Sequence, residues 1–425
     1  MRQRFIQSFP TSKDIQSALD NKELGKPYVA LSREEQIIDW NSKEIDYTGM
    51  PLTIEVLETG VFNINYGAGK YSINGGEWKT YTNAAERSIS VNAGDKVRFA
   101  MTPGSGTYAF SGNTIAFNVF GNIMSIVYGE NFADQTILKD SILVGAFSDC
   151  TGLANAENLI LPALSFTTSA NYPYSEMFKG CTSLIKSPKL LPATVLVKDC
   201  YRNMFNGCTS LTTAPKIPAT TLAQNCYALM FFGCTSLTQA PELPATTLAP
   251  GCYASMFQGC TSLTTAPELP VTTLTDCCYM SMFEGCTSLT TAPVLNAISV
   301  PDQSYRSMFK GCTSLTQAPE LPATILGELS YGNMFSNCTS LTQAPELPES
   351  TNVDAFTKGS YTSMFSNCSN LRSIKCLATS IGKYNFRYWL AGVSATGTFV
   401  KHPNATWPSG NDGIPKGWTV EDAVI

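Results

Sequence analysis

Apolar positions recur at a nearly constant spacing through the second part of this chain. The clearest marker is the motif GCTSL with its close variants, in which one cysteine keeps a fixed place. These cysteines are Cys150, Cys181, Cys208, Cys234, Cys260, Cys286, Cys312, Cys338 and Cys368. Successive copies lie 31, 27, 26, 26, 26, 26, 26 and 30 residues apart. A 26-residue period falls within the range of leucine-rich repeats, so the pattern predicts a solenoid.

The first half of one unit carries a helical spacing. In the unit that begins at Cys252, the residues Tyr253, Met256, Phe257 and Cys260 are spaced i, i+3, i+4, i+7. This spacing predicts a short helix with one buried face. Gly259 lies near the end of the pattern, where a helix can stop.

The second half of the unit has a different rhythm. Leu263, Ala266 and Leu269 follow at a spacing of three, with Pro267 and Pro270 among them. Proline fixes φ and removes an amide donor. We therefore expect a short strand near Leu263 that gives way to an extended, polyproline-like run.

Each apolar position forms a column through the array. The tyrosine column is Tyr174, Tyr201, Tyr227, Tyr253, Tyr279, Tyr305, Tyr331 and Tyr361, and the phenylalanine column is Phe178, Phe205, Phe231, Phe257, Phe283, Phe309, Phe335 and Phe365. A single unit cannot bury such a face, but stacked units can. Because strands stack about 4.8 Å apart and helices need about 10 Å, we expect the stack to curve with its strands on the concave side.

The fifteen cysteines allow several interpretations. No CxxC pair occurs, which argues against a zinc site. Disulfides remain an alternative, but one cysteine per unit in a core column favours a buried ladder of reduced thiols that act as small hydrophobic groups. A second column, eight residues earlier, holds Cys200, Cys226, Cys252 and Cys278.

The segments outside the array complete a predicted α+β fold. Residues 1–48 are predicted to form an attachment arm, with a short helix capped by Thr11 or Ser12 and a small hairpin or extended stretch after it. Residues 49–140 show alternating strand signals and turn-rich connections, so they predict a β-sandwich-like domain or small barrel. The solenoid is assigned to residues 141–376 and a C-terminal cap to residues 377–425, because a solenoid must cover its last apolar face.

Composition and charge narrow the chemistry. Charged residues make up 14% of the chain and the net charge is -5, without a basic run, so nucleic acid is not an expected partner. The one histidine, His402, is expected at the surface of the cap and not in a catalytic site. No segment is apolar enough to cross a membrane and no apolar leader follows the N-terminus, so we expect neither membrane insertion nor secretory export.

The strand side of the solenoid offers the candidate binding surface. Its predicted exposed positions are Thr213, Gln239, Thr265, Thr291, Gln317 and Gln343, beside the acids Glu242, Glu268, Glu320 and Glu346. Lys189, Lys216 and Val294 occupy the acidic slot in other units. Phe232 stands in a column that is polar elsewhere. These residues either contact a ligand or only keep the surface soluble, and Phe232 is either an interface anchor or repeat drift.

The motifs also resemble a known family. The repeat MFxGCTSLTxAPELPATTL resembles the BspA-like leucine-rich repeats of Bacteroidetes surface proteins. The segments YSINGGEW, ISVNAGDKV and FGNIMSIVYG are similar to the β-module that often precedes those repeats, and NATWPSGNDGIPKGWTV is similar to their cap. The resemblance implies adhesion and recognition, without catalytic residues. The opening IQSALDNKELGKPYVALSREEQIIDWNS is similar to N-terminal segments in structural proteins of Bacteroides phages, including crAss-like phages.

Three functions compete on this basis. A phage virion protein, such as a fibre, spike or decoration protein, would bind other virion proteins through its arm and a host surface glycan or protein through its solenoid. A bacterial surface adhesin that lacks its export signal here is the alternative. An enzyme is disfavoured, because a row of acids in equivalent places does not prepare two carboxylates for different roles. We expect no cofactor, no metal and no catalytic residue, and a homo-oligomer stays open.

Overall fold

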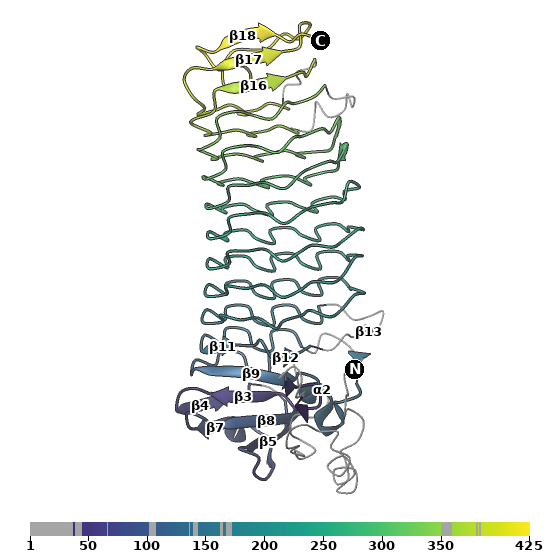
Figure 1. Ribbon diagram of the computed structural model, residues 1–425, viewed down its shortest axis with the longest axis vertical. Helices are drawn as coiled ribbons and strands as arrows, with labels where there is room; N and C mark the ends of the chain where they lie inside the picture. Colours follow the sequence, from purple (N-terminus) through teal and green to yellow (C-terminus); the bar gives the residue numbers. More distant parts are fainter. Residues whose placement is uncertain are drawn as a thin grey trace, which may run out of the picture.

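The computed structural model describes residues 37–38, 45–65, 67–101, 108–135, 137–138, 143–161, 165–166, 172–349, 359–379, 381 and 384–425. The chain forms an elongated stack of coils that rises from an N-terminal β-sheet to a small C-terminal sheet (Figure 1). The described structure is mostly β, with very little helix. The predicted solenoid is therefore confirmed. The predicted helix and cap of Thr11 and Ser12 lie outside the described residues.

A seven-stranded sheet forms the N-terminal end of the stack. Its order is β11-β9-β3-β8-β5-β6, and β12 also pairs with β9. The strands are β3 (Thr53–Val56), β5 (Gly69–Ile73), β6 (Lys79–Tyr81), β8 (Lys96–Met101), β9 (Phe117–Asn122), β11 (Leu153–Asn155) and β12 (Leu159–Ile160). β4 (Gly60–Asn63) and β7 (Ser88–Val91) pair separately. Because β11 and β12 pair parallel with β9, the sheet continues across the predicted boundary at residue 140.

The remaining elements are short. β1 (Ile37–Ile38) and β2 (Ile45–Asp46) pair antiparallel. The helical turns are η1 (Ala84–Arg87), α2 (Ser125–Tyr128) and η2 (Gly129–Asn131). Two parallel pairs lie along the stack, β10 (Ile137–Leu138) with β13 (Ser165–Phe166) and β14 (Ser299–Val300) with β15 (Ile325–Leu326). β16 (Ser373–Cys376), β17 (Thr398–Lys401) and β18 (Thr419–Asp422) form the C-terminal sheet.

The helix predicted for each repeat does not form, so the α+β expectation is wrong in its helical part. In the coil of residues 251–260, Gly251, Ser255 and Gly259 have φ values of +65°, +55° and +75°. A left-handed residue at every fourth position is incompatible with a right-handed helix. The chain instead makes a run of tight turns, which we call the zigzag segment, and it still points Tyr253 and Phe257 into the core.

Hydrogen bonds in the zigzag segment alternate between neighbouring coils and local turns. The amides of Tyr253 and Phe257 donate to carbonyls of the next coil, at 3.0 Å and 2.9 Å. The amide of Met256 donates three residues back, to Tyr253, at 3.1 Å. The backbone amides of the zigzag segment thus find all their acceptors only when neighbouring coils stack closely. Stacked α-helices lie about 10 Å apart, which is too far for such bonds.

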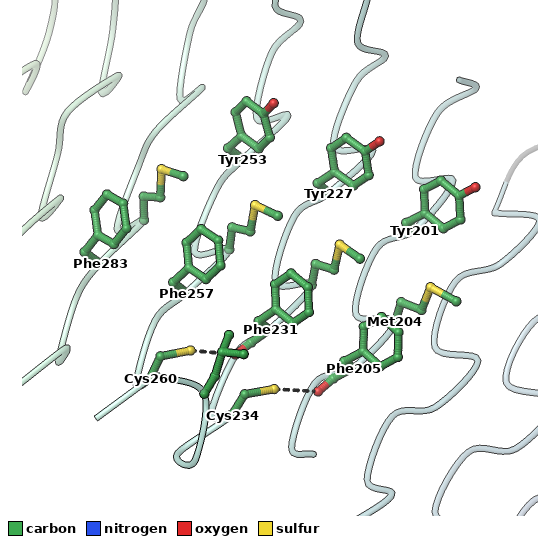
Figure 2. Packing of buried hydrophobic residues seen from close by; sticks show 14 of the residues in the cluster. Tyr201, Met204, Phe205, Tyr227, Phe231, Cys234, Tyr253, Phe257, Cys260 and Phe283 are labelled. Atoms are coloured by element: carbon green, nitrogen blue, oxygen red, sulfur yellow. Dashed lines mark hydrogen bonds between the residues drawn. The ribbon is translucent and has the colours of Figure 1, made fainter. Parts of the chain in front are cut away.

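The expected curvature is also wrong. Figure 1 shows coils piled with little bend. Along the phenylalanine column, ring centroids of Phe205, Phe231 and Phe257 are 5.5 Å apart with nearly parallel planes. The tyrosine column has similar spacings, 5.7 Å from Tyr201 to Tyr227. The two columns run side by side in the core (Figure 2).

Aromatic stacking also joins the solenoid to the sheets at its ends. Phe110, which belongs to the core of the N-terminal sheet, stacks on Phe147 at 5.4 Å, and Phe147 stacks on Phe178 at 5.6 Å. At the other end, Trp389 is fully buried, and its indole N–H donates to the carbonyl of Gly413 at 3.0 Å. One hydrophobic core therefore runs from end to end, and Trp389 helps to cover the last coil.

Proline decides where regular strands form. In the middle coils, with Pro267 as an example, the extended run has only isolated parallel bridges, such as the one that joins Thr265 to Thr291. β16 occupies the same place in the last repeat but has no proline, and it pairs with β17 over all four residues. The extended run agrees with the prediction, but the short strand predicted near Leu263 does not form. Proline lacks the amide donor that a ladder needs.

The cysteine column is a ladder of buried free thiols, as the favoured interpretation predicted. The structure adds a hydrogen bond that the sequence did not reveal. The Sγ–H of Cys260 donates to the carbonyl of Phe231, and that of Cys234 to the carbonyl of Phe205, each at 3.1 Å (Figure 2). The same bond recurs at every other GCTSL-type cysteine. Each thiol thus packs as a small apolar group and also bonds to the preceding coil.

The left-handed backbone conformation of Gly259 predicts that alanine and asparagine at this position will lower stability by different amounts. A Cβ at this position would lie 3.6 Å from the Cα of Gly233, an ordinary contact, so the positive φ is the main constraint. Gly259→Ala should lower the free energy of unfolding by about 1–2 kcal/mol. Gly259→Asn should cost less, because Asn337 and Asn367 adopt this conformation in other coils. Urea unfolding checks this, and equal losses for the two variants would contradict it.

The buried thiols predict a loss of stability in alkali. Burial raises the pKa of Cys286 from 9.0 to about 12 and that of Cys278 to about 11. As pH rises, these thiols therefore ionise first in the unfolded chain. The free energy of unfolding keeps the full contribution of the protonated thiols below about pH 9. Above that pH it falls by about 1.4 kcal/mol per thiol and pH unit. The urea midpoint should drop steeply between about pH 9 and 11.

A matched variant isolates the thiols from the tyrosines, whose pKa burial also raises. The second cysteine column continues as Ser304, whose hydroxyl donates to the carbonyl of Thr275 at 2.9 Å. Replacing Cys200, Cys226, Cys252 and Cys278 with serine should therefore flatten the alkaline slope. An unchanged slope would show that these thiols do not control it.

Candidate ligand-binding face

The predicted binding residues, except Phe232, lie on one face of the solenoid. The polar row consists of Gln239, Glu242, Thr265, Glu268, Gln317, Glu320, Gln343 and Glu346, and all eight side chains are exposed. They lie in the proline-containing run, where parallel bridges hold equivalent positions of adjacent coils together. The bridge from Thr265 to Thr291 is one example, and the bridge from Gln343 to Ser373 is another. Adjacent coils therefore present equivalent side chains side by side.

The three-residue rhythm of the run explains this exposure. Gln343 and Glu346 face solvent, whereas Ala344 and Leu347 are buried beneath them. Residues three apart share one side of a polyproline-like chain, which has three residues per turn. The spacing that predicted buried Leu263 and Leu269 thus also predicts which residues point outward.

The acidic slot changes character along the axis. Its occupants are, in order, Lys189, Lys216, Glu242, Glu268, Val294, Glu320 and Glu346. All of them are exposed. Beyond Glu346, the ammonium group of Lys375 lies 2.9 Å from its carboxylate. The acids therefore form two pairs, separated by an exposed valine and bounded by lysines at both ends.

A row of threonines beside the polar row was missed in the sequence. Thr212, Thr238, Thr264, Thr290, Thr316 and Thr342 are exposed at the position before each Thr or Gln of the polar face. The hydroxyl of Thr290 donates to the carbonyl of Thr264 at 3.2 Å, and that of Thr212 to Ile185 at 3.3 Å. The sequence shows that this threonine recurs. Its hydrogen bond to the preceding coil could not be predicted without the distance at which the coils stack.

Phe232 is not brought together with the polar row. It is half-buried in the zigzag segment, where its carbonyl accepts a bond from the amide of Gly207 at 2.8 Å. The polar row lies in the other half of the coil. The structure therefore does not support a single site that contains both, and the choice between interface anchor and repeat drift stays open.

Other candidate chemistry is sparse in the described ranges. His402 is half-buried, and its Nδ1 accepts a hydrogen bond from the amide of Asn404 at 3.1 Å. This bond holds the imidazole ring in a local turn. Histidine, cysteine and carboxylate side chains do not gather there in groups of three or more that could hold a metal ion. Over the same ranges, no helix is long and apolar enough to cross a membrane.

No family model matches the chain, and no curated protein matches it.

Proposed function

We propose that this chain is a non-catalytic binding protein of a phage virion, a fibre, spike or decoration protein that presents its solenoid to a bacterial surface. The observation that carries the proposal is the polar row, eight exposed side chains at equivalent positions of stacked coils. Such a surface suits many weak, equivalent contacts with a glycan or protein. We also assign the array to the BspA-like leucine-rich-repeat type, with a 26-residue period and a small β-domain before it.

Virion membership is supported by the resemblance of residues 15–42 to N-terminal segments of phage structural proteins. On this proposal the arm, residues 1–48, binds other virion proteins, while the solenoid contacts the host. Nucleic acid, membrane insertion and cofactors have no part in it. A non-enzymatic role is supported by the exposure of both Glu242 and Glu268, because neither carboxylate has the buried setting that distinguishes a catalytic acid from its partner.

Mass spectrometry of two fractions from the source culture tests the location. We expect the chain in stoichiometric amounts in purified, nuclease-treated particles. The washed outer membrane of the same cells is the comparison fraction. Recovery from the membrane fraction alone would contradict a virion role and would favour the surface-adhesin alternative.

Substitution in the polar row tests the binding face. Gln317→Ala combined with Gln343→Ala should lower the affinity of the purified protein for host cells by about tenfold, equivalent to about 1.4 kcal/mol. Binding of fluorescently labelled protein to cells is the measurement. Gln224→Ala, an exposed glutamine outside the row, is the matched control and should bind normally. Equal binding by all variants would show that the polar row is not part of the surface that binds the cells.

A further inference from the structure

A cavity of about 240 Å³ lies on the N-terminal sheet, at the point where the solenoid begins. Its lining comes from β3, β8, β9 and β11 and from the turns beside them. Lys96, Glu55, Asn118 and Asn155 are register neighbours across these four strands, so their side chains form one transverse row. The row lies on the outer face, because Ile54 and the residues that alternate with it are buried on the other side.

The polar groups of the cavity offer both donors and acceptors. The side-chain amide of Asn118 donates to a carboxylate oxygen of Glu55 at 2.9 Å. Asn155 and Asn158, both half-exposed, add two more amide groups. Amides can donate and accept at once, so these residues suit a ligand with many hydroxyl groups.

Aromatic rings supply the apolar part of the cavity. Tyr47 and Phe120 meet edge to face, with ring centroids 5.5 Å apart, and both are half-buried. The ammonium group of Lys96 lies over the Phe120 ring, 5.9 Å from its centroid. Burial and then the charge of Glu55 raise the pKa of Tyr47, which agrees with a carboxylate close to the tyrosine hydroxyl.

From this arrangement we propose that the cavity binds one ring of a neutral sugar. One carboxylate and one ammonium group balance each other, so neither an anion nor a cation is favoured. Amides and aromatic rings together match the polar hydroxyls and apolar C–H faces of a pyranose. The volume is below the roughly 300–1,000 Å³ typical of pockets for larger ligands, which suits a single ring. This site is separate from the polar row of the solenoid.

Saturation-transfer NMR on the full chain tests the proposal. The probes are methyl glycosides of glucose, galactose, mannose, fucose and N-acetylglucosamine. We expect transfer to at least one of them. Asn118→Ala and Glu55→Gln should weaken its binding by about tenfold or more, because each removes a polar partner from the cavity. Lys96→Gln changes an exposed side chain and should also weaken binding, which keeps the test valid if Asn118→Ala fails to fold.

The control is the variant with both Gln317→Ala and Gln343→Ala, which should bind the probe normally. No transfer to any probe would overturn the proposal, and so would unchanged binding by the cavity variants. Loss of binding in the control would place the sugar on the solenoid, which would also overturn it. Since the host-cell assay reads the polar row and this assay reads the cavity, the two can fail independently.

Discussion

Every second amide of the zigzag segment finds its acceptor only in the next coil, and the rest of the structure depends on this. The bond from Tyr253 to Cys278 and the bond from Phe257 to Met282 fix how closely two coils stack. At that distance the phenylalanine rings lie about 5.5 Å apart, and the thiol of each GCTSL-type cysteine, such as Cys260, reaches a carbonyl of the preceding coil. A single coil has none of these partners. Stability is thus a property of neighbouring coils, as in other solenoids.

The same constraint forms the proposed binding surface. Because coils stack in register, a residue that points outward once points outward in every coil, and the polar row follows from repetition. A departure such as Val294 then changes the surface without disturbing the core, since its side chain is exposed. The N-terminal sheet obeys a different rule. Its cavity gathers Tyr47, Lys96 and Asn155 from distant parts of the chain, so it offers one defined site and not a repeated one.

Sequence patterns predicted the solenoid, the buried columns and the exposed row, because each follows from repetition and from the conformational limits of proline. The zigzag segment was not predictable in this way. Tyr253, Met256, Phe257 and Cys260 fit a helical period, and over two turns a period of four residues is hard to tell from 3.6. The left-handed conformation that separates them falls on Ser255 here and on Leu229 one coil earlier, residues that give no signal for it. The cavity was missed because its residues are not close in sequence.

Through-hydrogen-bond scalar coupling in a deuterated, isotope-labelled sample tests the central constraint most directly. The amide nitrogen of Tyr253 should couple to the carbonyl carbon of Cys278, and that of Phe257 to the carbonyl carbon of Met282. Such couplings would show that the zigzag segment is bonded between coils. Couplings from these amides to carbonyls four residues earlier in the same coil would instead identify an α-helix. That result would contradict the stacking on which the columns, the thiol ladder and the polar row depend.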